Sequence, residues 1–443
     1  MSTIAAVSTP VGAGGIGILR VSGEDAIAVA DAIFISGDKS AGETLRANPR
    51  KMVFGTFGAE DFCDKGYAVY FPAREAYTGE DTVEFYLHGG VRIMRGALDA
   101  ALRHGAVMAK RGEFTLRAYL AGRMSLADAE GVADMINAES AAALRAAYRQ
   151  MEGSLTRAVD AVLDELLDIM SGLEAVLDYP EETEDEVLPP LEGRVRAVLG
   201  RVDALLATAA TGDMAKHGVT AVLAGKPNAG KSSLMNALLG RDRAIVTDIP
   251  GTTRDILEGS VECDGVKINI VDTAGLRESA DRVESEGVRR ALDAAQHADV
   301  VLYVLDTTAP DGEDWEVPDF GGTRVFTVRN KCDLTSFMCP RMYGCFAVSA
   351  KDGTGVDGLL HAVAALYREG ETADGEVITS ERHKDALYRA KRALESAVSQ
   401  INVTTDCVLI DLREAYDALG EITGRTASED VVNDIFDKFC VGK

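Results

Sequence analysis

The sequence predicts a multidomain protein of α/β plus α class, in which an α/β domain is inserted into an all-α one. Three observations lead to this expectation. Short apolar runs separated by turns fill residues 1–117, a helical periodicity runs through residues 118–214 and again through 372–443, and strand and helix patterns alternate over residues 215–371. Such alternation is typical of a doubly wound sheet. We therefore expect an N-terminal α+β domain, a helical domain in two segments, and an inserted α/β domain, with these boundaries.

Composition limits the class of protein. The chain has 443 residues, enough for several domains of about 100–200 residues each, and its 47% hydrophobic content is typical of a globular protein. No apolar run approaches the roughly 18 residues of a membrane span, and the first residues lack the basic side chains of a secretory signal. We expect a cytoplasmic protein. Its seven cysteines are scattered without a CxxC pair, which favours reduced thiols.

The charge is strongly acidic, with 71 Asp and Glu against 46 Lys and Arg and a formal net charge of −25. Most of this excess falls in the two helical segments. Nucleic-acid binding rests mainly on cationic contacts to phosphate. If the protein acts on nucleic acid, we expect a partner to supply much of the basic surface.

In the N-terminal domain, residues 12–17 match GxGxxG, the pattern of a dinucleotide site. That site requires a helix after the glycines, whereas residues 16–21 have the pattern of a strand. We therefore predict a structural glycine turn. The other expected elements are strands at 69–71 and 83–87 and helices at 25–34 and 92–103.

In the helical segments, apolar residues recur every three or four positions from Leu155 to Val176, which predicts a helix of about seven turns. Pro180 and the acidic run 181–186 are expected to end it, and a second helix is expected over 191–210. The strands expected in the inserted domain are 219–224, 267–271, 300–305, 324–328 and 345–348.

Residues 225–232 read GKPNAGKS and match GxxxxGK[ST] between a predicted strand and a predicted helix. Backbone N–H groups in such a loop, together with the helix N-terminus, bind phosphate. Lys231 is expected to reach the β- and γ-phosphates, and Ser232 to ligate Mg²⁺. The alternative is a glycine-rich turn without a ligand.

Three further motifs follow strands in the order that a Ras-like P-loop GTPase requires. Asp272 opens a DxxG motif on the magnesium side of the γ-phosphate. The Asp333 carboxylate can accept two hydrogen bonds from guanine, a pair that adenine does not offer. Residues 349–351 would bring a backbone N–H to the guanine oxygen. The predicted GTP contacts are Asn228, Ala229, Gly230, Lys231, Ser232, Ser233, Thr247, Asp248, Ile249, Pro250, Gly251, Thr252, Thr253, Asp272, Thr273, Ala274, Gly275, Asn330, Lys331, Asp333, Ser349, Ala350 and Lys351.

Two details bear on the hydrolysis mechanism. Many GTPases orient water with a Gln after DxxG, but Leu276 stands here, so another polar group of the following segment must act. No arginine finger is identifiable. The Asn228 amide oxygen could hold a monovalent cation that neutralises developing charge, or it could simply cap the loop. Residues 244–255 are expected to form the first switch loop, with a threonine hydroxyl completing the magnesium shell.

Motifs along the whole chain resemble those of the MnmE/TrmE family, the tRNA-modification GTPases that act on wobble uridine. They include residues 77–81 (YTGED), 111–118 (RGEFTLRA) and 248–255 (DIPGTTRD), and most specifically the C-terminal 439–443 (FCVGK). Two positions depart from the family pattern. Arg111 stands where a Pro is usual, and Arg123 stands where a Lys is usual.

The resemblance implies an N-terminal domain that binds a one-carbon tetrahydrofolate, in its 5-formyl or 5,10-methylene form, and that dimerises. It implies a homodimer and a heterotetramer with an FAD-dependent subunit, FAD being held only by that subunit. Together they would add a carboxymethylaminomethyl or aminomethyl group to carbon 5 of the wobble uridine, with tRNA bound largely through the partner and no membrane involved. GTP hydrolysis, stimulated by K⁺, would drive G-domain dimerisation and a conformational cycle.

The resemblance also assigns residues. Ser232 and Thr253 would hold Mg²⁺, and Glu284 would orient the attacking water. Cys440 would lie near the modification site, whereas composition alone favours a buried helix residue over a reactive thiol near a ligand. The remaining assignments are K⁺ at Asn228, Thr247, Ile249 and Thr252, and folate at Arg20, Glu84, Arg123 and Lys443.

Two other functions remain open from the sequence. A ribosome-assembly GTPase would share the G domain, but such proteins carry a basic RNA-binding appendage, and the appended segments here are acidic. A dimeric folate-responsive regulator would bind folate without acting on tRNA.

Overall fold

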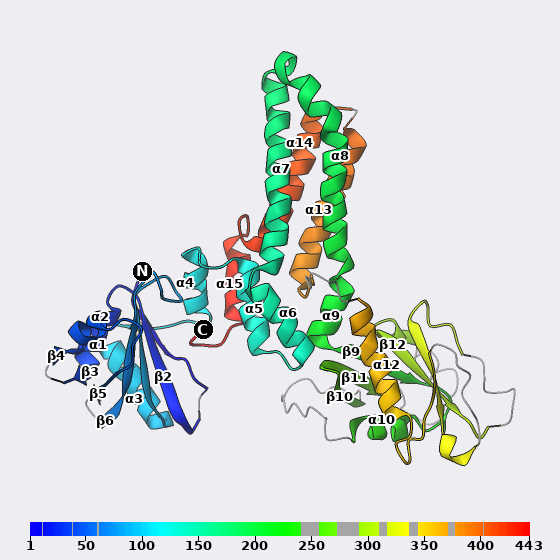
Figure 1. Cartoon of the computed structure of the whole chain (residues 1–443), viewed down its shortest axis with the longest axis horizontal. Helices are drawn as coiled ribbons and strands as arrows, with labels where there is room; N and C mark the ends of the chain where they lie inside the picture. Colours follow the sequence, from blue (N-terminus) through cyan, green and yellow to red (C-terminus); the bar gives the residue numbers. More distant parts are fainter. Residues whose placement is uncertain are drawn as a thin grey trace. The chain divides into compact units, whose positions relative to one another are not determined.

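The computed structural model describes residues 1–10, 12–37, 39–59, 62–240, 257–272, 292–309, 317–335, 344–370, 377–401 and 403–443. The chain forms two compact units (Figure 1). The first contains Met1–Ala133, Met151–Leu163 and Asp417–Lys443, and the second contains Asp134–Gln150 and Asp164–Tyr416. None of the described helices has the length and apolar character that a bilayer span requires.

The first unit contains an eight-stranded sheet of order β4-β3-β5-β6-β7-β2-β1-β8, in which only the β1–β8 pair is parallel. The predicted strand at 16–21 is part of β2, so the rejection of a dinucleotide site is confirmed. The strands are β1 (Ile4–Val7), β2 (Gly14–Ser22), β3 (Phe34–Ser36), β4 (Lys39–Ser40), β5 (Val53–Ala59), β6 (Phe62–Phe71), β7 (Thr82–Gly89) and β8 (Val107–Met108).

Three helices accompany this sheet: α1 (Ala26–Ile33), α2 (Ala41–Ala47) and α3 (Val91–Arg103). Their small apolar side chains and those of the strands form one buried cluster. Phe57 stands edge-on to Phe85, with ring centroids 5.4 Å apart, and Phe34 packs 5.8 Å from Phe85. These rings belong to the buried core that packs β3, β5 and β7 together.

In the rest of the first unit, the C-terminal residues pack against the helices that follow the eight-stranded sheet. Helix α15 (Glu429–Asp437) packs against α4 (Glu113–Leu120) and α5 (Leu126–Ile136) through buried Leu126, Phe436 and Phe439. Beyond α15 the chain forms a bridge between Val441 and Arg111. The last residues of the chain therefore lie beside the N-terminal sheet.

In the second unit, long helices lie alongside one another (Figure 1). Arg194 on α8 pairs with Glu165 and Asp168 on α7, and Lys391 on α13 pairs with Asp203 on α8. Leu166, Leu173, Val195, Leu387 and Leu412 are among their buried apolar residues. The helices around this bundle are α6 (Ala141–Met151), α7 (Ser154–Asp178), α8 (Pro180–Ala207), α9 (Ala209–His217), α13 (Glu381–Gln400) and α14 (Thr405–Thr423), and each lies wholly or partly in this unit.

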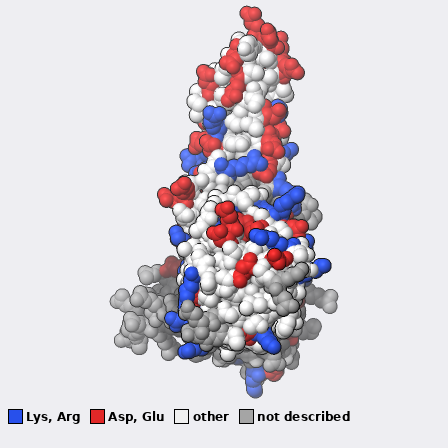
Figure 2. Space-filling model, turned by 90° about the vertical axis from the view of Figure 1, so that its left-hand side faces the viewer, with Lys and Arg blue, Asp and Glu red and all other residues white. Residues whose placement is uncertain are grey.

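The predicted start of the second helix near residue 191 is wrong, because α8 already begins at Pro180. Proline suits the first helical position, where its missing N–H is not needed, and acidic side chains there complement the positive end of the helix dipole. Pro189 and Pro190 are accommodated inside the helix. The exposed acidic side chains gather at the tip between α7 and α8, at the top of Figure 2.

The second unit also holds a six-stranded sheet of order β10-β11-β9-β12-β13-β14, parallel except for β10. All five predicted strands are confirmed, whereas β10 was missed. Its helices include α10 (Lys231–Leu239) and α12 (Val356–Glu369). The strands are β9 (Val219–Ala224), β10 (Leu257–Cys263), β11 (Val266–Asp272), β12 (Val300–Asp306), β13 (Arg324–Asn330) and β14 (Cys345–Ala347).

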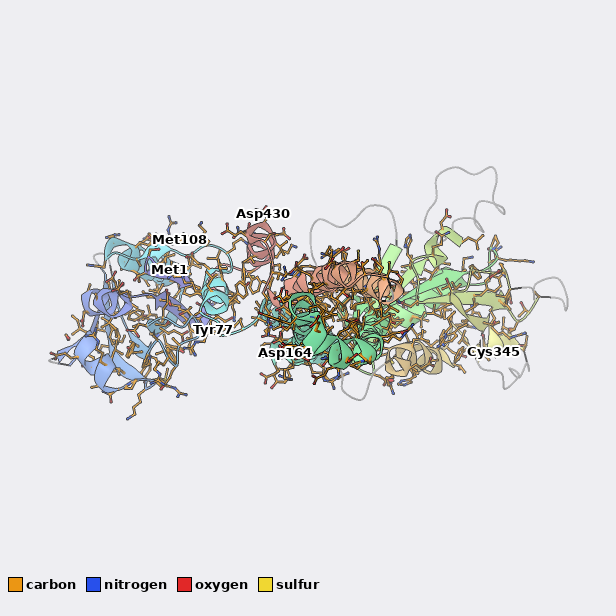
Figure 3. All side chains as sticks on the ribbon, turned by 90° about the horizontal axis from the view of Figure 1, so that it is seen from above. Met1, Tyr77, Met108, Asp164, Cys345 and Asp430 are labelled. Carbon is orange, nitrogen blue, oxygen red and sulfur yellow. The ribbon has the colours of Figure 1, made fainter. Side chains whose placement is uncertain are left out.

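Cys345 lies on the edge strand β14 (Figure 3) and is disulfide-bonded. The expectation of reduced thiols is therefore wrong for this residue, because spacing along the chain does not reveal which thiols the fold brings together. It is confirmed for the others that the structure describes, which are Cys63, Cys263, Cys332, Cys407 and Cys440.

Candidate functional site

The loop after β9 connects the central strand of the parallel sheet to α10. It turns through left-handed conformations at Asn228, with φ of 66°, and at Gly230, with φ of 93°. A Cβ at Gly230 would lie 2.2 Å from the Asn330 Nδ2 atom, so only glycine fits there. The resulting loop leads directly into the N-terminus of α10, which is the arrangement that binds phosphate.

Lys231 and Ser232 begin α10 and point to different partners. Lys231 Nζ donates to the carbonyl oxygens of Gly225 at 2.7 Å and Lys226 at 2.9 Å. Burial lowers the pKa of Lys231, and the Asp272 carboxylate partly offsets that effect. The Ser232 hydroxyl donates to Asp272 Oδ2 at 3.0 Å. A hydroxyl and a buried carboxylate at this spacing form a natural site for a hard cation such as Mg²⁺.

Asn330, at the end of β13, cross-links the site. Its Nδ2 donates to the Ala229 carbonyl at 3.0 Å, and its Oδ1 accepts from the Ala350 N–H at 3.1 Å. The side chain therefore ties the phosphate loop to the segment after β14. Asn330 is 2% exposed, so both hydrogen bonds are made away from bulk water.

Lys331 also links the phosphate loop to the ends of the neighbouring strands. Its Nζ donates to the Asn228 carbonyl at 3.2 Å and pairs with Asp306 at the end of β12. Although burial opposes the effect, hydrogen bonds from Lys331 and Thr308 hold the pKa of Asp306 below its ordinary value. Asp306 was not predicted from the sequence. Its position at the end of a buried strand was the signal that could have revealed it.

The exposed Asp333 lies in a short 3₁₀ helix, Cys332–Leu334, directly after β13. The Cys332 N–H donates to the Val348 carbonyl at 3.1 Å, which holds this helix beside the segment 349–351. Ser349 is buried, and its hydroxyl accepts from the Asp352 N–H at 3.3 Å. Lys351 is exposed. The two segments predicted to recognise guanine are therefore neighbours at one edge of the sheet.

The structure brings the predicted residues 228–233, Asp272, Asn330 to Asp333, and 349–351 to the carboxyl ends of the parallel strands. Ligands of open α/β sheets bind at this edge. The remaining predicted contacts lie outside the described residues. They are Thr247, Asp248, Ile249, Pro250, Gly251, Thr252, Thr253, Thr273, Ala274, Gly275 and Glu284.

A second cluster forms in the first unit around Arg20 on β2 and Glu84 on the paired strand β7. Arg20 Nε donates to Glu84 Oε1 at 2.8 Å, and the Tyr86 hydroxyl donates to Glu84 Oε2 at 2.8 Å. Burial and the neighbouring Glu84 raise the pKa of Tyr86 to about 12. The Arg20 guanidinium also lies 5.4 Å from the centre of the Phe114 ring. The sequence assigned no role to Tyr86 or Phe114.

The C-terminal segment meets this cluster. Arg20 Nη1 donates to the Gly442 carbonyl at 3.5 Å, and the Phe114 N–H donates to the Lys443 carbonyl at 3.2 Å. Arg123 is exposed and instead donates to the Ala73 carbonyl at 2.6 Å. Thus Arg20, Glu84 and the backbone of Lys443 belong to one neighbourhood, while the contact described for Arg123 is with another loop. Nearby, the Tyr77 hydroxyl lies 3.1 Å from Thr115 Oγ1 on α4 (Figure 3).

Cys440 is exposed and lies beyond the end of α15. The alternative of a buried helix residue is therefore wrong for Cys440. Its carbonyl oxygen accepts from the Gly112 N–H at 3.4 Å. The backbone is thus anchored while the thiol remains accessible to a reagent or substrate.

Comparison with known proteins accounts for nearly the whole chain. The family described as "GTP-binding protein TrmE N-terminus" matches residues 3–123, and the "MnmE helical domain" matches residues 126–440. A tRNA modification GTPase MnmE of Thermus thermophilus is 42% identical, over 99% of each chain. That of Pseudomonas syringae pv. syringae is 40% identical, over 100% of this chain and 99% of its own. The chain belongs to the MnmE family of tRNA modification GTPases.

This membership accounts for the inserted sheet with its phosphate loop, since an MnmE protein is a GTPase. The resemblance inferred from the sequence motifs is confirmed, as are the fold class and the enzyme class. Among solved structures, Era of Aquifex aeolicus is 26% identical, over 39% of this chain and 66% of its own, with a TM-score of 0.26. The FeoB G domain of T. maritima is 25% identical, over 33% of this chain and 98% of its own, with a TM-score of 0.24.

Proposed function

We propose that this MnmE-family GTPase works with an FAD-dependent subunit to modify carbon 5 of the wobble uridine in certain tRNAs, attaching a carboxymethylaminomethyl or aminomethyl group. The proposal combines GTP hydrolysis with tRNA modification, and one observation supports the GTP hydrolysis. The phosphate loop, Asp272, Asn330 and the 349–351 segment are joined by side-chain hydrogen bonds at one edge of a parallel sheet. Family membership carries the tRNA half.

In the GTP site, the loop N–H groups and Lys231 bind the phosphates, and Asp333 accepts from guanine. Ser232 and Thr253 hold Mg²⁺, which neutralises phosphate charge during hydrolysis. Glu284 orients the attacking water. Asn228 supplies a side-chain oxygen to K⁺ together with Thr247, Ile249 and Thr252. Asn228 adopts a left-handed conformation, which Asn tolerates better than most residues, so an Asn side chain can occupy this turn of the loop.

In the first unit, we propose that Arg20, Glu84, Arg123 and Lys443 bind a one-carbon tetrahydrofolate. Glu84 accepts from pterin amino groups, and the cationic side chains pair with folate carboxylates. The hydrogen-bonded set of Arg20, Glu84 and Tyr86, with the aromatic ring of Phe114 beside it, supports binding of a flat polar ring. The accessible Cys440 thiol lies at the same C-terminal segment, in keeping with a place near the modified uridine.

The proposal includes a three-part division of the chain into domains at 1–117, at 118–214 with 372–443, and at 215–371. It includes a homodimer whose G domains meet when GTP is bound, and a complex in which the partner subunit holds FAD and most of the tRNA. The net charge of −25 supports this sharing, since a polyanion is repelled by an acidic surface.

The test of the function is mass spectrometry of tRNA nucleosides from cells that lack the gene. We expect carbon-5 substituted wobble uridines to disappear and to return with the wild-type gene. A Glu284→Ala copy should fail to restore them while its protein still binds GTP. An unchanged nucleoside profile would contradict the modification role and favour ribosome assembly, which co-sedimentation with ribosomal subunits would then reveal.

The cation site has its own test. We expect K⁺ to raise the rate of GTP hydrolysis at least tenfold over Na⁺ at equal ionic strength, because a cation of matching size stabilises charge on the transferring phosphate. Asn228→Ala should remove this difference while retaining GTP binding. Equal rates in the two salts for the wild type would exclude Asn228 as a K⁺ ligand.

A further inference from the structure

The turn between β10 and β11 brings two metal-binding side chain types together. Cys263 ends β10 and pairs with Val266, so only Asp264 and Gly265 form the turn. Both have positive φ, 53° and 78°, as a type I′ hairpin requires. The Cys263 side chain is buried at 2% exposure, while Asp264 stands at the turn itself. The hairpin therefore presents a thiol and a carboxylate from adjacent residues.

Helix α12 supplies a third group. His361 Nδ1 lies 3.5 Å from Cys263 Sγ and 2.9 Å from Asp264 Oδ2. The three ligand atoms all lie within 4.8 Å of one another. Two turns further along α12, Arg368 pairs with the same Asp264 oxygen. The described residues contain one such group of three His, Cys, Asp or Glu side chains, and it is separate from the phosphate loop.

Hydrogen bonds alone cannot satisfy all three side chains of this group, whereas a bound metal ion can. A single ring nitrogen carries either one hydrogen or one lone pair, so Nδ1 cannot both donate to Asp264 and accept from the Cys263 thiol. A cation placed among the three atoms can bind all of them at once. Zn–S bonds of about 2.3 Å and Zn–N bonds of about 2.0 Å, at a tetrahedral angle, separate sulfur and nitrogen by about 3.5 Å. The observed Sγ–Nδ1 distance is 3.5 Å.

We propose that Cys263, Asp264 and His361 form a zinc site that clamps the β10–β11 turn to α12. Thiolate, imidazole and carboxylate are the ligand types that Zn²⁺ prefers, and water would complete the tetrahedron. Arg368 hydrogen-bonds the carboxylate in the manner of the outer partners that orient metal ligands. The His361 side chain is 54% exposed, which leaves a route from solvent to the site.

The test uses the full-length protein, stripped of metal with a chelator and titrated with Co²⁺ as a spectroscopic substitute for zinc. We expect one equivalent to bind with a near-ultraviolet sulfur-to-cobalt band, and Zn²⁺ to displace it. His361→Ala retains every thiol and alters a half-exposed side chain. It should weaken Co²⁺ binding at least tenfold and reduce the band.

Cys263→Ser should also abolish the band, and GTP binding by each variant serves to show that the fold is intact. Cys407→Ser is the matched control, because Cys407 lies on α14 and outside the cluster, and it should leave the titration unchanged. Absence of a cobalt–sulfur band in the wild type, or a band whose affinity is unaffected by His361→Ala, would overturn the zinc site.

Discussion

At the scale of single residues, Asp333 determines which base the GTPase binds under our proposal. A carboxylate accepts from the ring N–H and the amino group of guanine, whereas an amide offers one acceptor and donors. Asp333→Asn should therefore weaken GTP binding at least a hundredfold. The same variant should bind xanthosine triphosphate more tightly than GTP, because xanthine carries a carbonyl oxygen where guanine has its amino group.

Competitive nucleotide-binding measurements with both triphosphates check this prediction. Asp319→Asn is the matched control, since Asp319 is an exposed loop residue that accepts a backbone hydrogen bond from Gly321. An Asp333→Asn protein that retains the wild-type preference for GTP would remove Asp333 from base recognition.

Asn330 shows how one buried amide organises the site. Asn330→Ala would leave the Ala229 carbonyl and the Ala350 N–H without their partner, at a cost of about 1–3 kcal/mol in the free energy of unfolding. Denaturant unfolding measures this loss. Asn269→Ala is the comparison, because the Asn269 side chain donates one exposed hydrogen bond to the His217 carbonyl and should cost less than about 1 kcal/mol. Equal losses would contradict the importance of burial.

At the scale of elements, the C-terminal segment after α15 is held in the first unit by hydrogen bonds from residues near the N-terminal sheet. The Ser8 hydroxyl and the Arg20 guanidinium donate to the Gly442 carbonyl, and the Arg111 guanidinium donates to that of Phe439. Deleting residues 440–443 removes the hydrogen bonds to Gly442 and those from Gly112 and Phe114 to the Cys440 and Lys443 carbonyls, while the bond to Phe439 can remain. The deletion should lower the free energy of unfolding by about 1–3 kcal/mol. It should also abolish binding of tetrahydrofolate under our proposal.

Thermal unfolding and calorimetric titration with 5-formyltetrahydrofolate measure the two effects. Lys438→Ala is the control, because its ion pair with Asp434 is exposed and such pairs contribute little. Unchanged folate affinity after the deletion would show that Lys443 is not a ligand.

At the scale of the whole molecule, our proposal requires that GTP hydrolysis at the sheet of the second unit is transmitted to its helical segments. Among the described residues, one ion pair joins a strand of this sheet to the segment before α6, and a second joins α9, which leads into β9, to α5. Lys267 on β11 pairs with Glu139 at 2.6 Å, and Lys216 at the end of α9 pairs with Asp134 at 2.8 Å. The Ala142 N–H on α6 also donates to Gly265 in the β10–β11 turn at 2.8 Å. We expect these contacts to carry the coupling.

Glu139→Lys places two cations together and should loosen this junction without touching the nucleotide site. GTP hydrolysis should stay within about twofold of wild type, while tRNA modification in a reconstituted system should fall at least fivefold. Glu192→Lys, which breaks an exposed pair with Arg196 on α8, is the control. Parallel loss of both activities, or loss of neither, would contradict a coupling role.

Much of this molecule follows from local sequence. The five parallel strands were predicted because each is a short run rich in β-branched, aromatic or other apolar residues, a composition that favours strands. The GTP-site residues that the structure describes were predicted because the motifs that contain them begin at a strand end or within two residues of it. The start of α8 was not predicted correctly. A proline can either end a helix or begin one, and the packing of the neighbouring residues decides which.

Local patterns were enough to predict the class of fold and the phosphate loop, and the motifs along the chain were enough to predict the family. Hydrogen bonds and ion pairs between side chains far apart in the sequence became visible only in the folded chain. Arg20 and Glu84 are 64 residues apart and become partners because β2 and β7 pair in register. Cys263 and His361 are 98 apart and meet because a two-residue turn lies against α12. Such contacts depend on packing across the whole chain and do not follow from local patterns. The family resemblance placed Arg20 and Glu84 in one site, but it did not predict their ion pair.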